Sequence, residues 1–154
     1  MKKILMSLIV VLSLIIPTGT IMGAESKDCK VLEQVFGTKV KQENGVCRLE
    51  IMRKNIPVSN LGVQLSPEAI ELGFGANFEK VGDNTAVIGE FALLSEEVNP
   101  VIDALRKGNV EISAVHNHLI GEQPQIIYLH FQGLGNVESL AKTVKEAIAS
   151  TDNK

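Results

Sequence analysis

The order of apolar patterns in the second half of the chain most constrains its fold. Residues 85–93 are rich in apolar residues and indicate a strand. Ser95 is a favourable N-cap for the helix that follows, and residues 110–119 and 125–132 indicate two further strands. Asn136 caps a last helix whose apolar residues recur at helical spacing. This order predicts an α+β domain, in which a mostly antiparallel sheet carries helices packed on one face.

The first half of the domain is predicted to begin with a helix and a hairpin. Apolar residues recur at helical spacing in residues 29–36, and a glycine ends the pattern. Asn44-Gly45 is the strongest short hairpin signal, because both residues tolerate the left-handed backbone of a tight turn. It predicts an N-terminal β-hairpin with strands near 38–42 and 46–53.

Two features leave the local structure open. Gly73 and Gly75 indicate turns or bulges beside an extended piece at 70–78. Pro100 lies five residues after Ser95, which is later than the first helical turn where proline is tolerated. The helix after Ser95 therefore either kinks at the proline or begins later than its cap signal suggests.

The first 24 residues have the order of a secretory signal peptide. Two lysines are followed by an apolar run at 4–16 and by small residues before an expected cleavage site after Ala24. The apolar run is shorter than the roughly 20 residues that a membrane-spanning helix needs, which favours cleavage over an uncleaved anchor. We therefore predict a single exported domain at 25–154, secreted or otherwise extracytoplasmic, without a stable membrane anchor.

The charge of the predicted mature chain is acidic. The whole chain carries 15 Lys+Arg against 18 Asp+Glu, and loss of Lys2 and Lys3 with the leader moves the net charge from -3 to -5. Nucleic-acid binding calls for a basic surface, so this balance argues against it. It also argues against docking on anionic lipid.

The two cysteines, Cys29 and Cys47, both lie in the part predicted to be exported. An even number of cysteines in an oxidising compartment favours a disulfide. Such a bridge would tie the N-terminal segment to an early strand. The alternatives are a metal role, although the spacing matches no zinc motif, and two buried free thiols.

All three histidines of the chain lie within one stretch of fifteen residues. His116 and His118 are two apart in a predicted strand, so their side chains point to the same face of the sheet. Glu122 lies in the following turn, and His130 returns on the next strand. Three imidazoles and a carboxylate suit zinc, iron, manganese or copper better than calcium or magnesium. We therefore predict a transition-metal site formed by these four residues.

The register of the two histidine strands stays open at this stage. If His118 opposes Ile126, then Ala114 opposes His130 and all three imidazoles share a face. The apolar patterns of the two strands, however, match only after a one-residue shift, which would put His130 on the other face. A bulge near the turn, or burial of the second strand on both faces, would remove this conflict.

Three further residues are weaker candidates for ligand binding. Tyr128 is the only tyrosine and either donates to a ligand on the histidine face or packs across the strands. Arg53 ends a predicted strand and either binds an acidic group or is solvated. Asn117 lies between two of the histidines.

The chain resembles the LppY/LpqO family of mostly bacterial exported proteins and lipoproteins. The resemblance spans about residues 29–150, and its core is the pattern His-Asn-His, Glu-x-Pro and His; the matching segments are 89–101, 114–124, 128–130 and 140–141. It implies a compact α/β domain, present here in a single copy, in a family without an established activity. Asn55 stands where the family pattern has an aspartate, so any support of the site by that aspartate is in doubt here. No lipid-anchor cysteine is present at the cleavage site, which implies a free exported form.

Three functions are consistent with this sequence. The first is an exported metal-binding protein, which as an enzyme would be a metal-dependent hydrolase or an oxygen-using enzyme. The second is a metal-free module that binds a small cell-envelope ligand through the same polar residues. Glycan binding is disfavoured, since the chain has no Trp and one Tyr. The third is a structural or interaction domain in which the histidines hydrogen-bond within the fold.

Overall fold

The computed structural model describes residues 26–151, so the signal peptide predicted for residues 1–24 lies outside the described part of the chain. The strands are β1 (Lys41–Glu43), β2 (Val46–Met52), β3 (Val58–Asn60), β4 (Val63–Leu65), β5 (Gly73–Val81), β6 (Asn84–Leu93), β7 (Glu111–His116) and β8 (Ile127–Gly135). The helices are α1 (Lys27–Phe36), α2 (Val98–Lys107) and α3 (Val137–Ala149), and two short 3₁₀ turns are η1 (Pro67–Ile70) and η2 (Ser95–Glu97).

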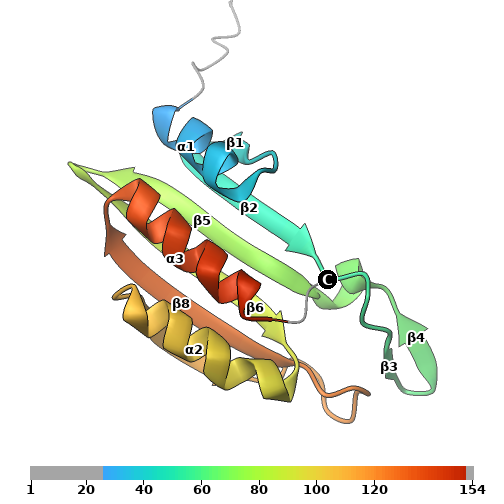
Figure 1. Ribbon diagram of the computed structural model, residues 1–154. Coiled ribbons are helices and arrows are strands. Elements are labelled where there is room, and N and C mark those ends of the chain that lie inside the picture. The colour runs from blue at the N-terminus through green and yellow to red at the C-terminus, as the bar shows by residue number, and fades with distance from the viewer. Residues whose placement is uncertain (1–25, 152–154) are drawn as a thin grey trace, which may run out of the picture.

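A six-stranded antiparallel sheet forms the centre of the domain, with the strand order β1-β2-β5-β6-β8-β7. The three helices cover one face of this sheet, and β3 and β4 form a separate hairpin beyond one end of it (Figure 1). The predicted α+β architecture, with helices on one face and an N-terminal hairpin, is confirmed. The face opposite the helices is called the open face below.

Local signals in the sequence determine several of these elements. Asn136 caps α3, because its side chain accepts hydrogen bonds from the backbone N–H groups of Glu138 and Ser139 at 3.0 and 3.2 Å. Asn44 and Gly45 both have positive φ and join β1 to β2, which confirms the predicted hairpin. Helix α1 ends at a left-handed glycine, as its pattern predicts.

The open question about Pro100 is settled by a later helix start. A 3₁₀ turn occupies Ser95–Glu97, and α2 begins only at Val98. Pro100 therefore falls in the first turn of α2, where its missing N–H group costs no helical hydrogen bond.

Residues 54–72 contain a hairpin that was not predicted, and the glycines after them form a strand rather than turns. The β3-β4 hairpin was not predicted, because its strands are only three residues long and lack a clear alternation. The prediction of turns or bulges at Gly73 and Gly75 is wrong. Both glycines lie within β5, which pairs with β2 in continuous register from Gly73 to Glu79.

Two apolar cores lie on the two faces of the large sheet. The main core fills the space between sheet and helices and includes Phe74, Phe91 and Phe131, whose rings pack edge to face at 5.0 and 4.9 Å. The smaller core packs the β3-β4 region and the 117–126 turn against one end of the sheet; its buried members are Ile56, Val58, Ile70, Leu72, Ala92, Ile126 and Tyr128. This second core fixes the surroundings of the histidines.

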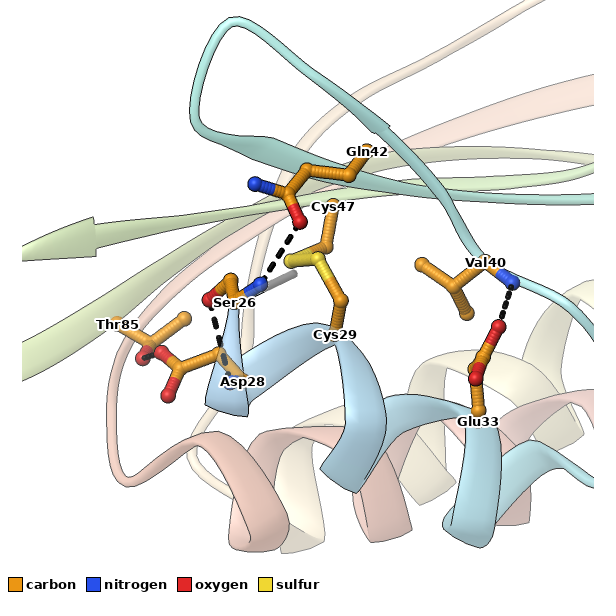
Figure 2. The surroundings of a disulfide bond; sticks show 8 residues. All are labelled: Ser26, Asp28, Cys29, Glu33, Val40, Gln42, Cys47 and Thr85. Atoms are coloured by element: carbon orange, nitrogen blue, oxygen red, sulfur yellow. Dashed lines mark hydrogen bonds between the residues drawn. A yellow bond between two sulfur atoms is a disulfide. The ribbon is translucent and has the colours of Figure 1, made fainter. Parts of the chain in front are cut away.

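The predicted disulfide between Cys29 and Cys47 is present and joins α1 to β2 (Figure 2). Both residues are buried in the main core. Two hydrogen bonds also hold α1 in place, one from the Thr85 hydroxyl in β6 to Asp28 at 3.0 Å and one from the Val40 backbone N–H to Glu33 at 3.1 Å (Figure 2). The bridge therefore anchors the first helix to the sheet.

Replacing both cysteines with alanine is expected to lower the free energy of unfolding by about 3 kcal/mol, because the bridge closes a loop across 18 positions of sequence in the unfolded chain. Urea denaturation of the Cys29→Ala/Cys47→Ala variant, beside the parent with and without reductant, measures this. A loss below about 1 kcal/mol would show that the remaining contacts of α1 suffice.

Candidate metal centre

A β-bulge in β7 brings the three histidines to the open face. The register of β7 with β8 shifts between Ile112, which pairs with Phe131, and Ala114, which pairs with His130. One extra residue in β7 thus lets Ile112 pack on the helix side while His116 and His130 point to the open face. The apolar patterns of β7 and β8 do differ in register by one residue, as the sequence indicates. The bulge that reconciles them lies within β7, between Ile112 and Ala114, and not near the turn.

The three imidazoles lie close together near the edge of the sheet. One nitrogen atom from each of His116, His118 and His130 lies within 4.8 Å of the others. The ring of His116 is 5.0 Å from each of the other two rings, centroid to centroid. All three side chains are at least partly exposed, so an ion can reach them from solvent. The three residues can therefore hold one metal ion.

Glu90 is part of this site and was not predicted. It lies in β6, opposite His130 in the neighbouring β8. Its Oε2 atom is 2.7 Å from Nε2 of His130 and 3.7 Å from Nε2 of His118. A glutamate within the apolar stretch 85–93 was a signal in the sequence, but only the pairing of β6 with β8 shows that it meets the histidines.

Glu122 has a different environment from the one expected. Its side chain is buried, and Oε1 accepts a hydrogen bond from the Ile126 backbone at 3.2 Å. The Oε2 atom is buried without a hydrogen-bond partner in the described chain. The group of donor atoms that lie within 4.8 Å of one another comprises the three histidines and includes neither Glu122 nor Glu90. In this structure Glu122 orders the turn, whereas Glu90 contacts the histidines.

Tyr128 contacts the histidines, and Asn117 holds the turn beside them. The Tyr128 ring stacks on His118, with centroids 3.4 Å apart and planes inclined by 8°. Its hydroxyl donates to the carbonyl of Ile70, which ties the site to the smaller core. Asn117 donates from Nδ2 to the carbonyl of Ile126 at 2.7 Å, across the base of the turn. Both side chains are thus engaged within the fold.

Burial raises the pKa of Tyr128 to about 12, and the carboxylates of Glu90, Glu122 and Glu71 add to this increase. The folded state therefore holds the phenol proton more tightly than the unfolded state does. The resulting contribution to folding stability is complete below pH 10 and is lost as the pH rises through 12. In a chain with one Tyr and no Trp, tyrosinate absorbance of the metal-free protein should report this group alone. We expect a midpoint near 12 for the folded protein, and a midpoint near 10 without unfolding would contradict it.

Arg53 lies in the protein interior rather than at a solvated strand end. Its guanidinium binds both carboxylate oxygens of Glu97 at 2.6 Å and donates to the carbonyl of Ala92 at 2.9 Å. It also lies 5.0 Å from the centre of the Phe74 ring. The acidic group that Arg53 binds belongs to its own chain.

Comparison with known proteins places the domain in a family. Residues 30–150 match a family described as Domain of Unknown Function (DUF1259). The chain belongs to this family. No curated protein and no solved structure matches the chain. The description of the DUF1259 family names no activity, so the residues of this domain are the guide to its chemistry.

Proposed function

We propose that this DUF1259 domain binds a transition-metal ion through His116, His118 and His130. The observation that supports the proposal is the convergence of one nitrogen from each histidine to within 4.8 Å of the others. Neutral imidazole is a good ligand for zinc, iron, manganese and copper, and a poor one for calcium and magnesium. Three imidazoles also leave a coordination position open for water or a ligand.

A purely structural role explains the histidines less well. Within residues 26–151, the His116 side chain makes ring contacts but no hydrogen bond, so side-chain hydrogen bonding does not account for the position of its ring. The carboxylate of Glu90 contacts two of the three rings, those of His118 and His130. A shared ion, by contrast, would engage a nitrogen of each of the three rings.

Glu90 supports ion binding in this proposal, either as a fourth ligand or as the acceptor that orients His130. We expect Glu90→Gln to weaken zinc binding about 10- to 100-fold, because the amide lacks the charge of the carboxylate. Glu122→Gln is the matched control. It keeps an oxygen for the Ile126 backbone and should change the zinc affinity less than about threefold. A stronger effect of Glu122→Gln than of Glu90→Gln, measured by zinc titration, would make Glu122 the ligand.

We further propose that the chain is exported, in keeping with its signal-peptide pattern and its resemblance to the LppY/LpqO family. The disulfide supports this proposal, since such bridges persist in oxidising compartments. Within residues 26–151, no helix is both long and apolar enough to span a bilayer. Mass spectrometry of the protein recovered from outside the cytoplasm should give a chain that begins at Glu25.

Calorimetric titration tests the proposed metal binding. The domain 25–154 is titrated with zinc, copper, manganese and iron(II), with calcium and magnesium as negative controls. The proposal expects one transition-metal ion per chain and loss of binding in His116→Ala/His118→Ala. Failure of all four transition metals to bind would exclude it and leave the metal-free ligand-binding module as the better account.

A further inference from the structure

A hollow in the open face adjoins the proposed metal centre. Four residues of neighbouring strands form one row across the sheet, in the order Glu50, Gly75, Glu90 and His130. Because paired residues of antiparallel strands point to the same face, this row runs from β2 to the histidines on the open face. Gly75 contributes no side chain and leaves a gap in the row.

The hollow at this gap has a volume of ≈ 330 Å³, which is at the lower end of the range for small-molecule sites. Its lining includes Arg48, Glu50, Met52, Glu71, Gly75 and Glu90. Glu90 therefore borders both the hollow and the histidines. A ligand in the hollow would lie directly beside an ion held by the three imidazoles.

The fold itself does not require a glycine at position 75. A Cβ atom there would approach the Glu90 carbonyl oxygen at 3.6 Å, an ordinary van der Waals contact. Gly75 also does not appear among the residues with positive φ, so its backbone conformation is open to other residues. Gly89 in the paired strand differs, since a Cβ there would lie 2.1 Å from the Phe131 ring. The space above Gly75 is thus a feature that a larger side chain would remove without a clash.

The charge of the lining favours a cationic ligand. The carboxylates of Glu50, Glu71 and Glu90 border the hollow, against one cation, Arg48. The guanidinium of Arg48 is already engaged by Asn77 at 3.1 Å and by Glu43 at 3.6 Å. Glu90 is engaged by His130, so the uncompensated negative charge comes from Glu50 and Glu71; it would repel an anion and attract a protonated amine.

We infer that the hollow binds a small amine-bearing molecule, with its ammonium group above Gly75 between Glu50 and Glu90. Neighbouring strands lie about 4.8 Å apart, so these two glutamates are separated by about 10 Å at the backbone, with room for one ammonium group between their side chains. The other end of the molecule carries an anionic oxygen, such as that of a carboxylate, and extends toward the histidines. This last step rests on the proposed metal function, because the bound ion would be the partner of that oxygen.

Three probes of equal chain length test this inference, namely 6-aminohexanoate, 6-hydroxyhexanoate and adipate. They share a carboxylate end for the ion and differ only at the other end. Each is titrated into isotope-labelled, zinc-loaded protein while the backbone amide signals of β5 and β6 are recorded. The amino acid should bind and shift the signals around Gly75, and the hydroxy acid and adipate should bind at least about tenfold more weakly. Equal binding of the hydroxy acid or adipate, or no binding of any probe, would overturn the inference.

Variants then separate the hollow from the metal centre. Gly75→Leu should abolish the tighter binding of 6-aminohexanoate while zinc affinity is retained, and Glu50→Gln should weaken the binding of 6-aminohexanoate about two- to fivefold. Glu79→Gln removes a carboxylate of β5 outside the hollow and should leave the affinity for 6-aminohexanoate unchanged. Undiminished binding of 6-aminohexanoate by Gly75→Leu would contradict the inference. Wild-type protein that takes up no zinc would instead contradict the proposed function.

Discussion

Arg53→Met is expected to lower the free energy of unfolding by about 3–5 kcal/mol, because it leaves the Glu97 carboxylate buried without its guanidinium partner. Arg53 and Glu97 are both almost fully buried, with relative exposures of 1% and 4%. The guanidinium also binds the Ala92 carbonyl, so a second hydrogen bond is lost with the charge. Urea denaturation at neutral pH measures the change.

The double variant Arg53→Met/Glu97→Met is the informative control. It removes both charges at once, and apolar replacement of a whole buried pair is often neutral or stabilising. The hydrogen bond from the Leu94 backbone to Glu97, at 2.8 Å, is lost as well, which costs about 1 kcal/mol. The double variant should therefore be more stable than Arg53→Met alone. If both variants are equally destabilised, the loss comes from packing rather than from an uncompensated charge.

His130→Ala is expected to reduce zinc affinity by at least about 100-fold, because it removes both a ligand and the partner of Glu90. The folded state should lose less than about 1 kcal/mol, since the His130 side chain is partly exposed. Gln132→Ala is the matched control, because Gln132 lies two residues further along β8 on the same face. Competition titration against a zinc-binding dye measures both affinities.

The metal affinity of the parent should also fall as the pH is lowered. Protons compete with the ion for the imidazole nitrogens, so acidification releases the metal. This dependence should be lost with His130→Ala together with the binding itself. Zinc affinity that does not depend on pH, or that survives His130→Ala, would locate the ion elsewhere on the protein.

Features set by neighbouring residues, together with the disulfide, were predicted correctly from the sequence. The Asn44-Gly45 turn is set by the conformational freedom of two adjacent residues, and the Asn136 cap by one side chain and the next backbone amides. The disulfide was inferred from the even cysteine count and the predicted exported context, and the structure forms it.

Features that depend on the pairing of distant strands were not predictable. The meeting of Glu90 with the histidines requires β6 to lie beside β8, although more than 30 residues separate these strands in the chain. The face of His130 depends on one extra residue in β7, which no local signal marks. Arg53 resembles a solvated strand end in sequence, and only the fold shows that it forms a buried ion pair with Glu97, 44 residues further along the chain.

Anomalous diffraction from zinc-loaded crystals tests the central claim most directly. The account predicts one strong peak at the zinc absorption edge, within about 2.0–2.1 Å of one nitrogen each of His116, His118 and His130. The peak should be absent from crystals of His130→Ala grown and soaked in the same way. A peak bound by other residues, or no peak in crystals with these histidines exposed to solvent, would contradict the account.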